Sequence, residues 1–526
     1  MTPASRLNGA GPRFLASAPM RASILAAGLY CLAMALAWAG FSTQMPVDWA
    51  FELILTQELK PFYAVSNPPL YSWIAWALQR VLPAGQTILL IINYGATFAL
   101  FGLYAFAAHR VVQHRVLAAL APWSLFLILP YGRLNFGYVN TQLLLPCILA
   151  SVVVLLAIAR RPRLALFVAL GLVVGLGTLA KLNYLFTIAC LLAACCLQPS
   201  MRAGLLRPAL AVSAVLAVAV VAPFAYAFHE AGNDLFALLR SKTAGGVPAD
   251  YAGQLGAGLT SAGIGIANYV GPAFLVGSAG WLLRRGGWAR GGGGAVAENA
   301  AARRFLRDAL IVGLAVILAG VVFFGIARIK VWYFHAFFLL APLYALTFWD
   351  HERAPRLGRL ALCGVVLGFA AVQSAIRIVE FTPYCPGKCR DVVPYDRLAQ
   401  HLRAAGFERG TIVSAGVRVG GNLRPHFARA RVGTLGPRLL LPPRQSGPVG
   451  QCLVIWRADE VESPAAARKA AAQTFVALGL PGPASETPVR SIRFALHGWP
   501  ASGRPGRSGV VVWHYILIKT GNARCG

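Results

Sequence analysis

The stretch ASILAAGLYCLAMALAWAGFSTQMPVDWAFELILTQELKPFYAVSNPPLYSW, residues 22–73, joins an apolar run to a segment with charges and two adjacent prolines. The run 21–41 is long enough to cross a bilayer, because a transmembrane helix needs about 20 apolar residues. It is too long for the apolar part of a signal peptide, so it predicts a retained first helix. The charged segment that follows is then expected at the membrane surface.

The composition is that of a membrane protein. Of 526 residues, 57% are hydrophobic and 13% are charged, whereas soluble domains average about 25% charged residues. A formal net charge of +30 would favour nucleic acid as the partner of a soluble protein. Here the arginines gather in short loops between apolar runs, where they orient the helices and meet anionic lipids. The sequence therefore predicts membrane lipids, and no nucleic acid, as partners.

Apolar runs recur up to about residue 380 and predict a polytopic α-helical membrane protein with about eleven transmembrane helices. They lie near residues 21–41, 86–107, 116–130, 140–159, 164–180, 183–197, 207–228, 263–283, 309–327, 332–349 and 358–378. We expect residues 1–20 to be a cytoplasmic N-terminus and residues 21–379 to be the transmembrane domain, with an outer loop over 42–85.

The arginine-rich loops alternate along the chain, which sets the orientation. All of them become cytoplasmic if the N-terminus is inside, and the loop 42–85 then faces outward. An odd number of spans places residues 380–526 outside as well. The protein is accordingly expected in the inner membrane of a bacterium, with a periplasmic C-terminal domain.

Residues 380–526 are predicted to form a small α/β domain. The segment 395–407 has helical periodicity, and GTIVSAG, QCLVIW and SGVVVWHYILIK are typical of short strands. Four cysteines lie in this part, and an oxidising compartment favours two disulfides. The natural pairing is Cys385 with Cys389 and Cys452 with Cys525, although the sequence leaves the other two pairings open.

The outer loop 42–85 contains the candidate chemistry. It is longer than a connection requires, and its apolar and charged residues are interleaved, as in a segment that lies on a membrane surface. Asp48 is either a helix cap or a general base. Glu52 lies one helical turn further on, on the same face, and is the second candidate for the base.

These residues resemble those of the membrane-embedded C-type glycosyltransferases, the broad family of protein O-mannosyltransferases, aminoarabinose transferases and rhizobial lipopolysaccharide glycosyltransferases. Such proteins open with one span and an outer loop with an acidic motif, followed by a proline element. Here Asp48 and Pro68-Pro69 match that pattern. Trp49 replaces the usual second acid and Asn67 the usual His or Lys. We therefore name no metal ligand, and a divalent ion stays open as a cofactor.

The resemblance implies a glycosyltransferase, of the hexosyl or pentosyl type, that takes its sugar from a polyprenyl phosphate. The acceptor would be lipopolysaccharide, another glycan, a lipid or a protein of the cell envelope. Asp48 would be the general base, with Glu52 as the alternative. Cationic groups would stabilise the leaving phosphate. The candidate substrate-binding residues are Lys60, Asn67, Tyr71, Arg133, Lys181, Arg328, Lys330 and Tyr333.

Two other classes of function fit a chain with many spans. A transporter or lipid flippase is one, but internal repeats and paired broken helices, which are typical of transporters, are not evident. A non-catalytic assembly protein of the envelope is the other. His335, beside Tyr333, is interpreted as an interior histidine with a hydrogen-bond partner rather than as a ligand.

Overall fold

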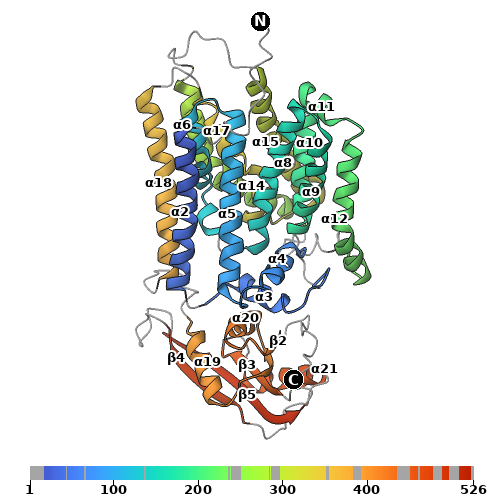
Figure 1. Ribbon diagram of the computed structural model, residues 1–526, viewed down its shortest axis with the longest axis vertical. Helices are drawn as coiled ribbons and strands as arrows, with labels where there is room; N and C mark the ends of the chain where they lie inside the picture. Colours follow the sequence, from blue (N-terminus) through green and yellow to red (C-terminus); the bar gives the residue numbers. More distant parts are fainter. Residues whose placement is uncertain are drawn as a thin grey trace. The chain divides into compact units, whose positions relative to one another are not determined.

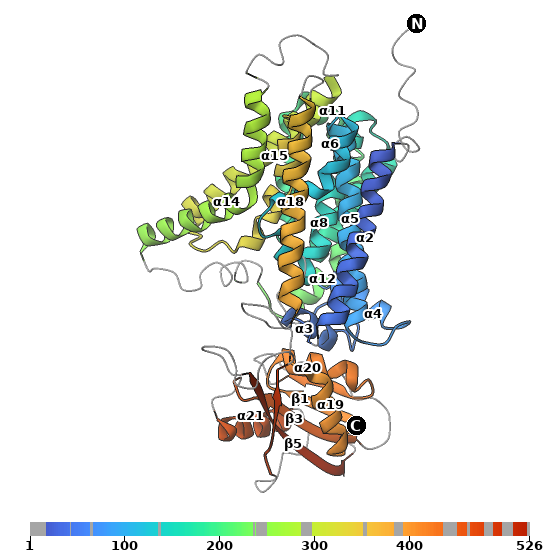
Figure 2. The same cartoon turned by 90° about the vertical axis from the view of Figure 1, so that its left-hand side faces the viewer.

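The computed structural model describes residues 17–42, 44–63, 67–134, 138–234, 237, 250–283, 285, 297–350, 355–382, 393–434, 450–459, 463–477, 488–496 and 509–522. The chain divides into two compact units (Figures 1 and 2). The first comprises Met1–Leu32, Val65–Leu70 and Asn93–Ala375, and the second comprises Ala33–Ala64, Tyr71–Ile92 and Ile376–Gly526.

Long apolar helices dominate the first unit and continue into parts of the second. Within the described residues, seven helices have the length and hydropathy of a membrane span, or eight if one bent pair counts as a span. The protein is therefore a multi-pass membrane protein. The seven are α2 (Ala18–Phe41), α5 (Gln86–Val111), α8 (Val139–Arg160), α12 (Leu210–Glu230), α14 (Tyr251–Leu283), α15 (Ala297–Phe324) and α18 (Arg356–Phe381).

The predicted count of about eleven spans is not confirmed, because several apolar runs fold as shorter pieces. The run 116–130 forms α6 (Arg115–Leu120) and the 3-10 helix η2 (Ala121–Leu127). The run 332–349 forms η4 (Val331–Tyr333), α16 (His335–Phe338) and α17 (Ala341–Leu346). The remaining short helices are α7 (Tyr131–Leu134), α9 (Leu164–Ala180), α10 (Tyr184–Leu197) and α11 (Pro199–Leu205).

Prolines mark several of these breaks. The chain bends by 117° between α10 and α11, and Pro199 opens α11. Pro122 and Pro342 lie in the first positions of η2 and α17. Proline has no N–H to donate and clashes with the preceding turn, so it favours the start of a helix, although α8, α12 and α14 continue through Pro146, Pro223 and Pro272. An apolar run does not reveal such a break.

Close helix packing in the first unit depends on glycines. In Figure 1, α9 runs beside α8 and α12, and α9 packs against both of these helices. A Cβ atom placed on Gly171 of α9 would lie 2.6 Å from the carbonyl oxygen of Ser213 in α12. The Ser213 hydroxyl donates a hydrogen bond of 2.7 Å to the carbonyl oxygen of Phe167. Small residues at helix contacts allow this backbone approach in membranes.

The second unit contains a mixed five-stranded sheet with the order β2-β1-β3-β5-β4. Its strands are β1 (Gly410–Ser414), β2 (Arg431–Thr434), β3 (Gly450–Arg457), β4 (Arg490–Ala495) and β5 (Val510–Asn522). β1 pairs in parallel with β2 and β3, whereas β5 is antiparallel to β3 and β4. β1, β3 and β5 coincide with the strands expected from sequence.

The two faces of the sheet bury different side chains, because successive residues of a strand point to opposite sides. Leu453 and Ile455 of β3 pack with α19 (Tyr395–Ala404) and α20 (Val417–Leu423). Cys452, Val454 and Trp456 belong to a cluster on the other face. Figure 2 shows α19 and α21 (Pro464–Ala477) on opposite sides of the sheet. The short η5 (Arg424–His426) follows α20.

The cysteines separate into two groups. The six in the apolar runs are free: Cys31, Cys147, Cys190, Cys195, Cys196 and Cys363. Cys452 is disulfide-bonded. Its expected partner Cys525, together with Cys385 and Cys389, lies outside the described residues, so the pairing stays a prediction.

We expect Gly171→Ala to destabilise the protein, because the added methyl group overlaps the α12 backbone and overpacking costs about 1–3 kcal/mol. Gly102→Ala on α5 is the matched control, since no atom lies within 4 Å of a Cβ at that position and alanine favours a helix by about 1 kcal/mol over glycine. Thermal unfolding in detergent should show a lower midpoint for Gly171→Ala only. Equal midpoints would contradict this packing.

Candidate active site

The helix α3 (Val47–Leu55) has two different faces. Asp48 and Glu52 are one turn apart and therefore share a face. Ala50 and Ile54 are also one turn apart, and residues two apart in a helix point to nearly opposite sides. Pro46 occupies the N-cap position and Asp48 lies in the first turn. Asp48 is thus not the N-cap residue of this helix, and its role as general base stays a prediction.

Glu52 is a buried acid with one defined partner. Its side chain is 4% exposed, and its Oε2 atom accepts a hydrogen bond of 2.6 Å from the Ser72 hydroxyl of α4 (Leu70–Leu78). Burial raises the pKa of Glu52 to about 7; the Ser72 hydrogen bond lowers it, and the charge of Asp48 raises it further. A buried acid that keeps its proton near neutral pH, beside a second carboxyl group, is an arrangement that acid–base catalysis can use.

Ser72 was missed by sequence reasoning. It follows Pro68-Pro69 in the sequence and carries no local signal of a role, since its partner lies 20 residues away. Only the packing of α3 against α4 brings the hydroxyl to the carboxylate. Tyr71, predicted to bind substrate, is fully buried.

The outer loop after α3 is held by its own contacts. The Lys60 ammonium forms an ion pair of 2.9 Å with Glu58, and both side chains are substantially exposed. The Tyr63 hydroxyl donates to the carbonyl oxygen of Glu58, and the Trp73 indole donates to that of Lys60. Burial raises the pKa of Tyr63 to about 12. Lys60 therefore already has an anionic partner. Asn67 is exposed.

A second group of predicted residues comes together in the first unit. The Lys181 ammonium donates a hydrogen bond of 2.8 Å to the Thr141 hydroxyl and lies 5.6 Å from the ring centre of Tyr333. The Lys330 ammonium lies 5.5 Å from the ring of Trp332, which stacks on Tyr138 at 4.7 Å. Both cations are half-buried against aromatic faces, a favourable arrangement for a cation.

Two predicted cations are less well defined. The Arg328 side chain is exposed, and that of Arg133 lies outside the described residues. His335 is fully buried and shares a hydrogen bond of 2.8 Å with the Tyr269 hydroxyl, as expected for an interior histidine with a partner. Within the described part of the chain, no three His, Cys, Asp or Glu side chains are grouped as a metal site requires.

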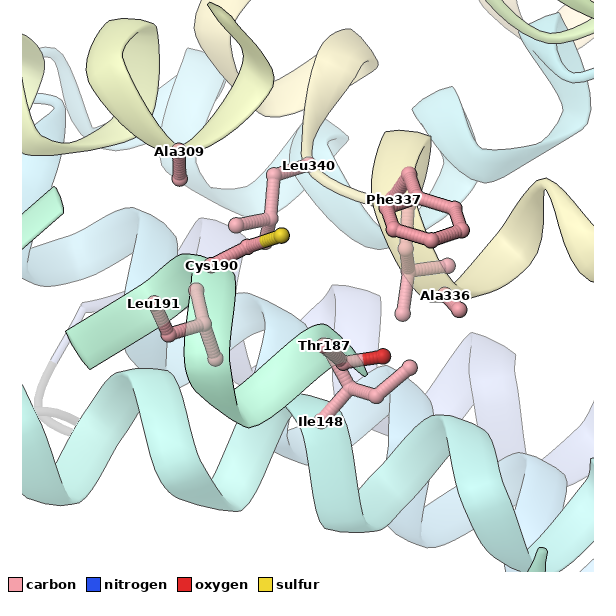
Figure 3. Close-up of a pocket in the computed structure, with 9 residues that line it drawn as sticks. Ile148, Thr187, Cys190, Leu191, Ala309, Ala336, Phe337 and Leu340 are labelled. Carbon is pink, nitrogen blue, oxygen red and sulfur yellow. The ribbon is translucent and has the colours of Figure 1, made fainter. Parts of the chain in front are cut away.

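Figure 3 shows a small cavity in the first unit, between α8, α10, α15 and α16. Its volume is about 10 Å³, and its lining is apolar apart from the Thr187 hydroxyl. A cavity needs at least about 10–15 Å³ to hold one water molecule. It is therefore a packing defect and not a site for a sugar or a lipid.

The buried Glu52 generates a prediction about pH. Its pKa rises from an ordinary 4.5 to about 7 on folding, so its stabilising contribution is complete below about pH 4.5 and is lost as the pH rises through about 7. The loss is on the order of 3 kcal/mol. Glu52→Gln should have the same unfolding temperature as wild type at pH 4.5. At pH 8 it should unfold at a higher temperature than wild type.

The control is Leu53→Met, a volume-conserving change at a neighbouring buried position that alters no charge. It should keep the wild-type dependence of unfolding temperature on pH. If Glu52→Gln kept that dependence too, Glu52 would not be the buried acid described here.

No family model matches the chain. Its sequence is 25% identical over 396 residues to the lipopolysaccharide core galacturonosyltransferase RgtB of Rhizobium johnstonii, an alignment that covers 73% of this chain and 76% of that protein. Its fold is similar to that of ArnT from Cupriavidus metallidurans bound to undecaprenyl phosphate, with a TM-score of 0.53 and 12% identity over 95% of this chain and 98% of ArnT.

The apo state of the same ArnT gives the same TM-score of 0.53 and 12% identity, over 93% of this chain and 97% of ArnT. At such low identity the structural likeness shows the fold alone. The relative found by sequence, RgtB, is a glycosyltransferase. The resemblance to the membrane-embedded C-type glycosyltransferases that Asp48 and the Pro-Pro element indicate is thereby confirmed.

Proposed function

We propose that the protein transfers a sugar from a polyprenyl phosphate to an acceptor of the bacterial cell envelope, at the outer face of the inner membrane. The observation that carries the proposal is the pair of carboxyl groups on α3, one half-buried and one fully buried against Ser72. The glycosyltransferase relative supports the reaction class. The ArnT structure, which contains bound undecaprenyl phosphate, supports a lipid-linked donor.

The reaction is a substitution at the anomeric carbon. The oxygen of an acceptor hydroxyl forms a bond to that carbon, while the bond from the carbon to the phosphate oxygen breaks and its electron pair leaves with the phosphate. Asp48 takes the proton of the hydroxyl as general base. Glu52 stays largely protonated below its pKa of about 7, so it adds little negative charge beside Asp48 at that pH.

Cationic groups stabilise the phosphate as its charge grows. Lys181 and Lys330 are the best candidates, because aromatic rings and the Thr141 hydroxyl hold their ammonium groups in place. Lys60 is a weaker candidate, since it is exposed and already paired with Glu58. Arg133 and Arg328 remain predictions, as does a divalent ion.

The first donor to test carries a galacturonosyl group, and the first acceptor is the lipopolysaccharide core, as named for the relative RgtB. We expect a deletion strain to lack one hexuronosyl residue of its lipopolysaccharide core by mass spectrometry, and plasmid-borne wild type to restore it. An unchanged envelope glycan profile would contradict the proposal.

Plasmid-borne Asp48→Asn should not restore the hexuronosyl residue, because an amide cannot accept the proton of the acceptor hydroxyl. The variant should still be as abundant in the membrane as wild type. Leu53→Met, on the same helix, should restore the hexuronosyl residue fully. If Asp48→Asn restores transfer within a few-fold of wild type and Glu52→Gln does not, the base is Glu52. If neither change matters, the chain is no transferase, and transport or an assembly role gains support.

Lys181→Met and Lys330→Met should each lower the rate of transfer by about tenfold to a hundredfold, because a charge-assisted contact is worth about 1.5–3 kcal/mol. Lys→Arg at the same positions should reduce the rate less, since it keeps the charge. The control is Lys469→Met, at an exposed position of α21. Transfer rates are measured with purified protein in liposomes. If Lys181→Met and Lys330→Met lower the rate no more than Lys469→Met does, these two lysines do not contact the phosphate.

A further inference from the structure

The face of α3 opposite its two acids is attached to the sheet of the second unit. Both ribbon views place α3 against α20 (Figures 1 and 2), and these helices pack together. Ile54 is 3% exposed and belongs to the same hydrophobic cluster as Val419 and Leu423 of α20. The core of the α/β sheet therefore includes a residue of the outer loop.

One glycine sets how closely the helices approach. A Cβ atom on Gly421 of α20 would overlap the carbonyl oxygen of Ala50. Any other residue at this position would push α3 away from α20, because a backbone carbonyl cannot move aside as a side chain can. The contact thus fixes the distance between the two helix backbones.

Two amide side chains hold the chain on either side of α3. Asn422 is 4% exposed; its Oδ1 accepts from the Met45 N–H at 2.7 Å, and its Nδ2 donates to the Met45 carbonyl oxygen at 3.2 Å. Gln57 does the same for Val432: its Oε1 accepts from the N–H at 2.7 Å and its Nε2 donates to the carbonyl oxygen at 2.8 Å. Val432 lies in β2, an edge strand, so Gln57 pairs with groups that a further strand would use.

A third contact extends this attachment towards α4. The Arg424 guanidinium donates to Gln79 Oε1 at 3.1 Å, and Gln79 Nε2 donates to the Thr56 hydroxyl at 2.6 Å. Thr56 follows the last residue of α3. Both ends of the helix are therefore hydrogen-bonded to the α/β part of the unit, while its middle touches α20.

We propose that Gln57, Gly421 and Asn422 are positioning residues, through which the C-terminal sheet holds α3 in the orientation that its acids need for transfer. None of the three carries chemistry itself; each acts through the backbone of the outer loop. The proposal rests on the proposed function for its catalytic consequence, but the attachment itself is a separate physical claim. A displacement of about 1 Å from such distant changes lowers a rate by up to about a hundredfold.

The test uses the full-length protein with Asn422→Ala, and Ser414→Ala as the matched control. Ser414 is buried and its hydroxyl donates to backbone carbonyls of the same α/β part, at 3.0 Å to Gly416 and 3.3 Å to Gly433, not to α3. Hydrogen exchange of residues 45–57 should become about tenfold faster in Asn422→Ala and stay at the wild-type rate in Ser414→Ala. Equal exchange in the two variants would overturn the attachment.

The catalytic consequence is read from the rate and its pH profile. Asn422→Ala should lower transfer about tenfold to a hundredfold, and its profile should move to lower pH as water reaches Glu52. The titratable groups coupled to Glu52 are Asp48 and Tyr63, and neither is substituted in this variant. Asn422→Asp keeps an oxygen that accepts the hydrogen bond from the Met45 N–H. Its transfer rate should therefore lie between those of wild type and Asn422→Ala. A pH profile like that of wild type would contradict a positioning role.

Two further outcomes separate the claims. If wild type transfers no sugar from galacturonosyl polyprenyl phosphate to lipopolysaccharide core, the proposed function fails and hydrogen exchange alone decides the attachment. If Asn422→Ala does not accumulate, Gln57→Ala replaces it, because this change leaves the sheet intact and removes the bonds from the loop side. Normal exchange and normal transfer in Gln57→Ala would overturn the proposal.

Discussion

The close approach of α3 to α20 is the constraint on which the candidate site in the second unit depends. It places the backbone of Ala50 directly against Gly421, and it leaves the other face of a nine-residue helix to carry Asp48 and Glu52. A helix this short is only marginally stable by itself in water. Its geometry therefore derives from the hydrophobic cluster around Ile54 and from the amide pairs at both ends.

The electrostatics of the site follow from the same placement. Packing buries Glu52 and brings Ser72 to it, while Asp48 in the first turn stays half-exposed. Desolvation is the main cause of the raised pKa of Glu52. In the first unit the cations Lys181 and Lys330 lie against aromatic rings, a favourable arrangement for a cation.

The membrane character of the chain was predictable, because hydrophobic runs are local signals. The spacing of Asp48 and Glu52 also predicted a shared helical face, since that relation depends only on helical geometry. The breaks at Pro122, Pro199 and Pro342 could not be inferred from prolines alone, since Pro146, Pro223 and Pro272 lie inside continuous helices.

Other features depend on distant contacts. Ser72 and Asn422 meet α3 from 20 and 377 residues away, and no pattern in a single sequence reports such pairs. β2 was not expected because it is only four residues long. β4 was missed because its alternate side chains are exposed and two of them are arginines. Sequence patterns thus indicated the class of protein and the two candidate acids. The contacts of Ser72 and Asn422 that hold this region became evident only in the folded chain.

The most direct test of the central claim is a transfer assay with the purified chain in liposomes, supplied with galacturonosyl polyprenyl phosphate and lipopolysaccharide core. Mass spectrometry follows both products. The account predicts one polyprenyl phosphate released for each hexuronosyl residue gained by the acceptor, and no turnover of the donor without an acceptor hydroxyl. Transport of the lipid across the bilayer with no new glycosidic bond would contradict it.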